Sequence, residues 1–166
     1  MVKHKILILI LLLIGFANPS CISMSVPESK RVMSEDVAFI NPMVPYNKED
    51  DNSIDHIWRN PTNGNSISYI SNCKEQDEVN IEHLYSELFN SVEKSKEVKK
   101  EYFTFNNRRA IKSYIVGDID GINTHISFVI FKKNKCSYVL SQIAIKKTYT
   151  TDIKYFNSFV KGFKAP

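Results

Sequence analysis

The strand pattern between residues 101 and 145 constrains the fold of this chain more than any other feature. From Ile122 to Phe131, alternate positions are almost wholly apolar, while the positions between them are polar first and apolar later. This predicts a long strand that is covered on both faces towards its end. Asp120-Gly121 before it and Lys133-Asn134 after it favour tight turns. Three more strands are predicted around it, at 101–106, 108–118 and 135–145. Together they predict an antiparallel meander.

A hairpin and a helix precede this meander. The predicted strands 55–59 and 65–72 flank Pro61-Thr62-Asn63-Gly64, whose Asn-Gly step supplies the positive φ of a tight turn. Apolar residues then recur at spacings of three and four from Ile81 to Val92, and Asn80 is a suitable N-cap. These patterns place an amphipathic helix between the hairpin and the meander.

A second helix ends the chain. Thr150-Thr151-Asp152 predicts its start, and its apolar residues continue to Phe163. The order hairpin, helix, meander, helix predicts a single α+β domain, an antiparallel β-sheet flanked by helices, over residues 53–166.

The N-terminus has the pattern of a secretory leader. Lys3 and Lys5 precede nine apolar residues, Ile6 to Ile14, far fewer than the roughly 20 residues of a membrane-spanning helix. Gly15-Phe16-Ala17 would allow an ordinary signal peptidase to cut after Ala17. The chain would then be freely secreted.

A second cut, before Cys21, is also compatible with the sequence. Ser20-Cys21 resembles the lipobox of bacterial lipoproteins, in which a small residue precedes a cysteine that is acylated and becomes the mature N-terminus. The match is partial, because Asn18 stands where leucine is usual and Pro19 is uncommon there. With this cut, residues 1–20 form the signal peptide.

The cysteine count favours the lipidated form. An exported chain enters an oxidising compartment, where unpaired thiols are uncommon in small domains. The chain has three cysteines. If Cys21 carries acyl chains such as palmitate, Cys73 and Cys136 remain as a pair. Both lie beside turns at predicted strand ends, and the meander order can bring those ends together. We therefore predict lipidation of Cys21 and a disulfide between Cys73 and Cys136.

Residues 21–52 predict a flexible tether. They contain Pro27, Pro42, Pro45 and the acidic run Glu49-Asp50-Asp51, with no sustained periodicity. Such a segment buries too little apolar surface to offset the entropy of ordering it. The domain is therefore expected to begin near residue 53.

The chain resembles small bacterial lipoproteins of the PsbP-like and DcrB-like α/β/α sandwich class. The resemblance covers residues 54–164 and rests on NGNSISYISNC, on the strand-turn-strand around Asp120-Gly121, on the cysteine ahead of the fourth strand and on the terminal FNSFVKGF. It implies a sandwich fold and a binding role. That family has no shared catalytic motif, so the resemblance implies no site residue and no partner.

Catalysis and metal binding find little support in the sequence. A histidine base needs an orienting carboxylate and a nucleophile within reach, and no such grouping surrounds His125, His83 or His56. None of them has a second ligand at the spacing of a zinc site. We expect a non-enzymatic protein without cofactor or metal. The alternative is a small secreted or periplasmic hydrolase that uses His125 or His83.

The charge distribution suggests a partner. Residues 21–90 carry a net charge of −7 and residues 91–166 a net charge of +9. The basic residues predicted to form one binding face are Lys99, Lys100, Arg108, Arg109, Lys132 and Lys133. Such a face suits an anionic headgroup or an acidic envelope protein, and export makes nucleic acid an unsuitable partner. We expect a lipid-anchored protein of the bacterial envelope, at the outer rather than the inner membrane because Ile22 follows the cysteine.

Overall fold

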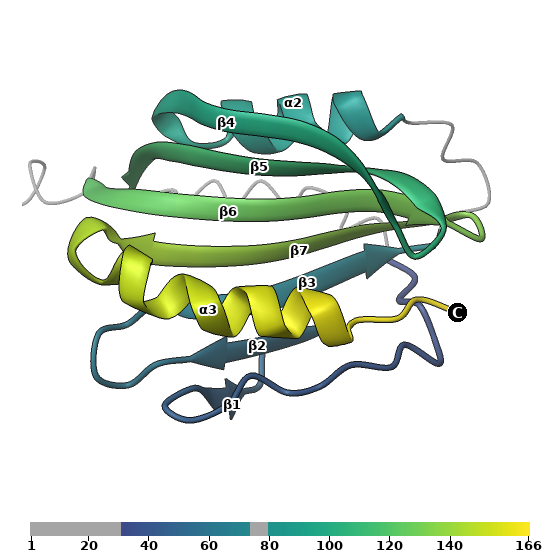
Figure 1. Ribbon diagram of the computed structural model, residues 1–166, viewed down its shortest axis with the longest axis horizontal. Helices are drawn as coiled ribbons and strands as arrows, with labels where there is room; N and C mark the ends of the chain where they lie inside the picture. The colour runs from purple at the N-terminus through teal and green to yellow at the C-terminus, as the bar shows by residue number, and fades with distance from the viewer. Residues whose placement is uncertain (1–30, 74–79) are drawn as a thin grey trace, which may run out of the picture. The chain divides into compact units, whose positions relative to one another are not determined.

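Seven antiparallel strands form one sheet in the computed structural model, which describes residues 31–73 and 80–166. In chain order, the elements are β1 (Asn47–Glu49), β2 (His56–Arg59), β3 (Ser66–Asn72), α2 (Ile81–Asn90), β4 (Glu93–Phe105), β5 (Arg108–Ile119), β6 (Ile122–Lys133), β7 (Cys136–Ile145) and α3 (Lys146–Gly162). The order across the sheet is β1-β2-β3-β7-β6-β5-β4. Pairing of β3 with β7 therefore joins the N-terminal strands to the meander (Figure 1).

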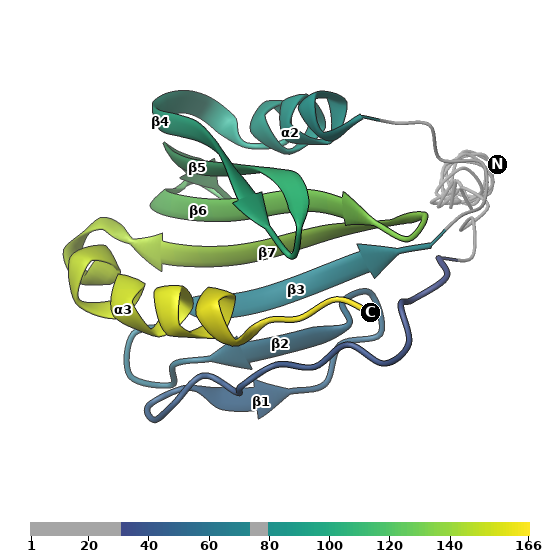
Figure 2. The same ribbon diagram turned by 45° about the vertical axis from the view of Figure 1, so that its right-hand side comes forward.

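The two helices lie on opposite faces of the sheet, so each face has its own core (Figures 1 and 2). Under α3, Phe156 and Phe159 pack with Trp58, Phe131 and Tyr138. Under α2, a second cluster packs aliphatic side chains of β5 and β6, namely Ile111, Ile115, Ile126 and Ile130. Alternate residues of the central strands enter opposite cores, which is why these strands are apolar on both faces. The predicted α+β sandwich is confirmed.

Three two-residue turns connect β4 to β7. Both residues of each turn have positive φ: Asn106-Asn107, Asp120-Gly121 and Asn134-Lys135. This is the geometry of the turns whose twist matches that of the flanking strands, and Asn, Asp and Gly adopt it most readily. The last turn lies one residue later than predicted, at Asn134-Lys135.

Two elements begin earlier than the sequence predicts. β4 starts at Glu93 rather than Glu101, so the lysine-rich stretch before Glu101 is strand. Charged side chains are common on such an edge strand because they hinder pairing with another chain. α3 starts at Lys146 rather than Thr150, with no side-chain cap at Ile145. Asp152 therefore lies inside the helix and is buried.

Residues 31–52, expected to be part of a flexible tether, pack on the domain instead. Ala38 and Lys164 exchange two backbone hydrogen bonds, of 3.0 and 2.7 Å. The Phe39 ring contacts the rings of Trp58 and Phe159. A few well-placed aromatic side chains thus fill the α3 core and offset the ordering cost of a segment that has no periodicity.

Cys73 and Cys136 form a disulfide. Cys73 directly follows β3, and Cys136 is the first residue of β7. These positions agree with the predicted bridge, because the register places Asn72 opposite Ser137. The predicted leader, Cys21 and residues 21–30 lie outside the described residues.

Candidate functional site

The basic residues predicted to form one face are divided between the two faces of the sheet. The predicted residues form three pairs of sequence neighbours on β4, β5 and β6, and neighbours on a strand point to opposite faces. Judged by the register with core residues, Lys99, Arg108 and Lys133 lie on the α3 side, and Lys100, Arg109 and Lys132 lie on the α2 side. The structure therefore does not bring the six together.

Several of these residues also have partners within the domain. Lys99 pairs with Glu101 at 2.7 Å, and Arg109 pairs with Glu82 at 3.1 Å. The Lys100 ammonium lies 3.8 Å from the centre of the Tyr85 ring. These contacts engage the charges locally and leave them less available to a ligand.

His125 belongs to an aromatic cluster on the α3 side of the sheet. Its Nδ1 atom is hydrogen-bonded to the Tyr114 hydroxyl, and the Tyr114 ring stacks on Tyr149 with 4.7 Å between centroids. Ser127 Oγ and the Tyr149 hydroxyl are 2.9 Å apart. Burial lowers the pKa of His125, which favours the neutral ring. The ring is held by a phenol, whereas a histidine base of a hydrolase is usually oriented by a carboxylate.

The cluster borders a small pocket of about 210 Å³ between the sheet and α3. Its lining includes Lys99, Lys112, Tyr114 and Asn157. Because Glu101 also lines it and pairs with Lys99, the lining charges partly cancel.

The other two histidines lie apart from this cluster. His83 is exposed on α2, and its Nδ1 atom lies 3.5 Å from Oε1 of Glu87. The two residues are four positions apart on one helix, where side chains are ordinary neighbours. His56 stacks on Trp58 with 5.7 Å between centroids, and its Nδ1 is buried without a hydrogen-bond partner in the described residues. Burial lowers the pKa of His56. The described ranges contain no cluster of three or more His, Cys, Asp or Glu side chains that could hold a metal ion.

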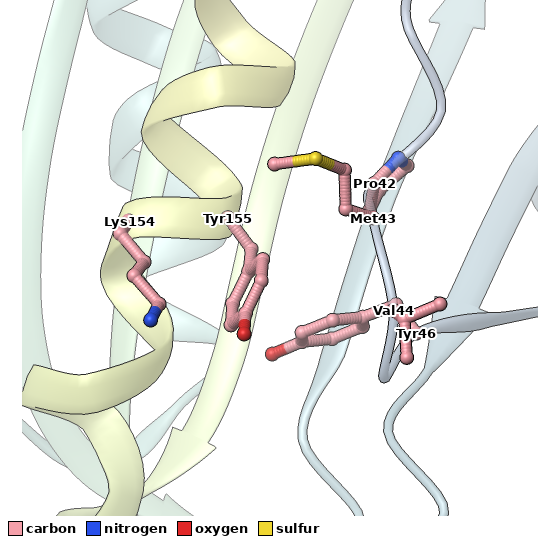
Figure 3. A pocket seen from close by; sticks show the side chains of 6 residues that line it. All are labelled: Pro42, Met43, Val44, Tyr46, Lys154 and Tyr155. Carbon is pink, nitrogen blue, oxygen red and sulfur yellow. The ribbon is translucent and has the colours of Figure 1, made fainter.

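A larger groove, of about 850 Å³, lies between residues 31–52, here called the N-terminal segment, and α3 (Figure 3). It is lined by Pro42, Met43, Val44, Tyr46, Lys154 and Tyr155. Figure 3 shows the Met43 side chain extended towards α3, with Tyr46 and Tyr155 facing each other; their ring centroids are 5.4 Å apart. Most of the lining surface is apolar, so the groove suits an apolar group.

The carboxylate of Asp152 fixes the position of Tyr46, one of the side chains that line this groove. Its Oδ2 atom accepts a hydrogen bond of 3.0 Å from the hydroxyl of Tyr46, which lines the groove. The same oxygen accepts hydrogen bonds from the side-chain amides of Asn60, Asn63 and Asn65, at 3.3, 3.0 and 2.7 Å. One buried carboxylate thus ties α3 to the N-terminal segment and to the turn between β2 and β3.

These hydrogen bonds determine the charge state of the carboxyl group. Burial alone would raise the pKa of Asp152, but the four donors outweigh it and keep the pKa below its usual value. Burial and the neighbouring carboxylate raise the pKa of Tyr46. At neutral pH the phenol therefore donates and the carboxylate accepts.

Sequence reasoning missed this groove because it assigned residues 21–52 to a tether. A usable indication was present: residues 37–46 contain no charged side chain, although acidic pairs stand on either side, at Glu35-Asp36 and Glu49-Asp50. Flexible tethers are usually poor in aromatic side chains, so the uncharged run with Phe39 and Tyr46 differs from an ordinary tether.

No helix in the described part of the chain is both long enough and apolar enough to cross a membrane.

The sequence matches no protein-family profile and no curated protein. Solved structures do resemble the fold. Cyanobacterial PsbP from Synechocystis sp. PCC 6803 superposes with a TM-score of 0.62 at 9% identity, over 82% of this chain and 92% of that one. LpqN of Mycobacterium tuberculosis, described as involved in cell envelope biogenesis, gives 0.52 at 10% identity, over 82% and 83%. The chain thus has the PsbP-like fold, as its resemblance to that class implies.

Proposed function

We propose that this chain of PsbP-like fold is a lipoprotein of the bacterial envelope, anchored through acylated Cys21, whose domain binds a partner and catalyses no reaction. The disulfide is the observation that carries the proposal. A bridge between Cys73 and Cys136 suits an oxidising compartment outside the cytoplasm. It also leaves Cys21 as the single remaining cysteine, beside a lipobox-like sequence.

Two further observations support this proposal. LpqN, which shares the fold, is described as a protein of cell envelope biogenesis. The groove between the N-terminal segment and α3 offers an open, mostly apolar site, as expected of a binding domain. By contrast, His125 pairs with Tyr114, and His83 lies on an exposed helix surface. The hydrolase alternative therefore has no observation that favours it.

Fractionation of cells tests the anchor directly. Wild-type protein should pellet with membranes, incorporate labelled palmitate and have an intact mass that corresponds to cleavage before Cys21 plus acyl chains. The Cys21→Ser variant should lose the label and move to the soluble fraction, because acyl chains supply most of the membrane affinity of such a protein. Separation of the two membranes of a Gram-negative host should place the wild type in the outer membrane.

Ser25→Ala serves as a control, because it changes a side chain near the proposed anchor and leaves both Cys21 and the disulfide in place. Recovery of Cys21→Ser in the membrane pellet at the wild-type level would contradict the lipoprotein proposal. A mature mass that corresponds to cleavage after Ala17 would contradict it equally.

A further inference from the structure

The N-terminal segment presents apolar side chains to solvent along one side of α3. We call residues 37–46 the strip. Three of its large hydrophobic side chains are strongly exposed: Ile40 at 65%, Met43 at 63% and Val44 at 85%. They occur within five residues of each other in a stretch without charge. Single exposed hydrophobic residues are ordinary, but a contiguous set marks a surface that contacts something apolar.

The strip is fixed to the helix. Ile40 packs on Gly162, where an added Cβ would lie 3.0 Å from the Ile40 side chain. Further along, Met43 and Val44 line the groove together with Tyr155 (Figure 3). Because Tyr46 is held by Asp152 at the other end, the exposed side chains are presented in a defined position beside α3.

Next to the strip, α3 presents a row of lysines. Lys147, Lys154 and Lys161 recur every seven residues, which is about two turns, so they lie on one face of the helix. All three are exposed, and no ion pair joins them to an acidic side chain of the described residues. The only acidic residue of the helix is Asp152, which is 6% exposed. We call these three residues the lysine row.

The strip and the lysine row together have the composition of a surface that rests on a membrane. Apolar side chains that can enter the headgroup boundary stand beside cations that attract acidic headgroups, and exposed acids are absent from both described segments. We propose that α3 and the strip dock on an anionic lipid bilayer. An acidic protein would attract the same lysines, but the lysines together with three exposed apolar side chains match a partner with an apolar interior beneath an anionic surface, which a bilayer provides.

This inference extends the proposed function, on which it rests for the nearness of a bilayer. Arg31 follows Cys21 by ten residue steps, so a lipid at Cys21 would keep the start of the described domain within about 35 Å of the membrane. A weak surface contact becomes effective at such a distance, because tethering raises the local concentration. The lipid would anchor the chain, and the docking surface would orient the domain.

Vesicle flotation tests the docking without the anchor. We would use the chain from Ile22 to Pro166, which contains every element of the described fold and lacks Cys21. It should float with vesicles that contain phosphatidylglycerol and remain unbound to vesicles of phosphatidylcholine alone. Raising the salt concentration should weaken the binding, since screening shortens the reach of the lysine charges.

Variants separate the two parts of the surface. Each lysine near an anionic surface contributes about fivefold in affinity, so the combined Lys147→Gln, Lys154→Gln and Lys161→Gln variant should bind about a hundredfold more weakly. Met43→Ser with Val44→Ser should lose about tenfold, and this loss should persist at high salt. The matched control replaces Lys96, Arg108 and Lys135 by Gln, which removes the same charge from exposed side chains outside α3 and the strip.

Equal weakening by the control and by the lysine-row variant would overturn the proposal, because the attraction would then reflect net charge alone. Absence of binding to phosphatidylglycerol vesicles by the folded chain would also overturn it and would favour an acidic protein partner. Neither result would affect the lipid anchor, which is tested by the mass and fractionation of the full chain. Far-ultraviolet circular dichroism of each variant establishes that the fold is intact.

Discussion

Replacing Asp152 by asparagine should destabilise the domain strongly at neutral pH. The substitution keeps the size of the side chain but removes its charge and turns one acceptor into a donor. The amides of Asn60, Asn63 and Asn65, which all donate to Asp152 Oδ2, would then meet either that donor or a neutral carbonyl oxygen. Even with its carbonyl oxygen in the place of Oδ2, asparagine would accept these hydrogen bonds without a charge, and hydrogen bonds to a charged acceptor are roughly twice as strong as neutral ones.

The size of the effect follows from the hydrogen bonds. One hydrogen bond to a charged acceptor contributes about 1.5–3 kcal/mol, and a buried group left without a partner costs about 1–3 kcal/mol. Four donors converge on a single oxygen, so their contributions do not add in full. We expect the free energy of unfolding to fall by about 3 kcal/mol, a large fraction of the total for a domain of this size.

The pH dependence gives a sharper test than the magnitude. The pKa of Asp152 in the folded protein is depressed below the value of about 3.9 that it has when unfolded. The stabilisation is therefore complete above the unfolded pKa and is lost as the pH falls through the folded pKa. The difference in unfolding free energy between wild type and Asp152→Asn should stay constant from about pH 7 to pH 5 and shrink below about pH 4.

Urea denaturation of both proteins across this pH range measures the difference directly. Other carboxyl groups with depressed pKa values, such as Asp118 and Glu101, titrate in both proteins and cancel in the comparison. Asp36→Asn is the control, because it removes an exposed carboxylate. A difference that stays constant down to about pH 3, or one below about 0.5 kcal/mol at pH 7, would refute the argument.

Two other predictions concern the disulfide and the N-terminal segment. Replacing both Cys73 and Cys136 by serine should lower the free energy of unfolding by about 4 kcal/mol, because the bridge closes a loop with a sequence separation of 63. A urea midpoint of this variant equal to that of the wild type under non-reducing conditions would contradict this. Phe39→Ala should cost about 2–3 kcal/mol, since its half-buried ring contacts Trp58 and Phe159. A melting temperature equal to that of the wild type would mean that Phe39 does not contribute to the core.

The meander could be predicted because its pattern is local. Alternation along each strand and turn residues such as Asp120-Gly121 depend only on neighbours in sequence. The start of α3 could not be predicted from its caps, because Asp152 has the chemistry of a residue that begins a helix and serves instead as a buried acceptor for groups about 90 residues away. Its role depends on tertiary contacts that no local pattern contains.

The predicted basic face was wrong as a single surface, for a reason that was available in the sequence. Lys99-Lys100, Arg108-Arg109 and Lys132-Lys133 are neighbours on strands, where successive side chains point in opposite directions. Basic residues that are next to each other in the sequence of a strand therefore lie on opposite faces of the sheet. On a helix the reverse holds, and Lys147, Lys154 and Lys161, which are far apart in sequence, form one row.

The pairing of β3 with β7 determines when the domain can be completed during synthesis. β3 emerges first, from the ribosome and again on export, but the residue opposite Asn72 is Ser137, and Ser137 Oγ donates to the Asn72 carbonyl across a separation of 65 residues. Until β7 emerges, β3 presents an unpaired edge and an uncovered apolar surface. The meander, by contrast, pairs only strands that are consecutive along the chain, so it can assemble early. A nascent chain interrupted before residue 136 would therefore expose a hairpin that has no partner, and this is the interval in which the protein has most need of a chaperone.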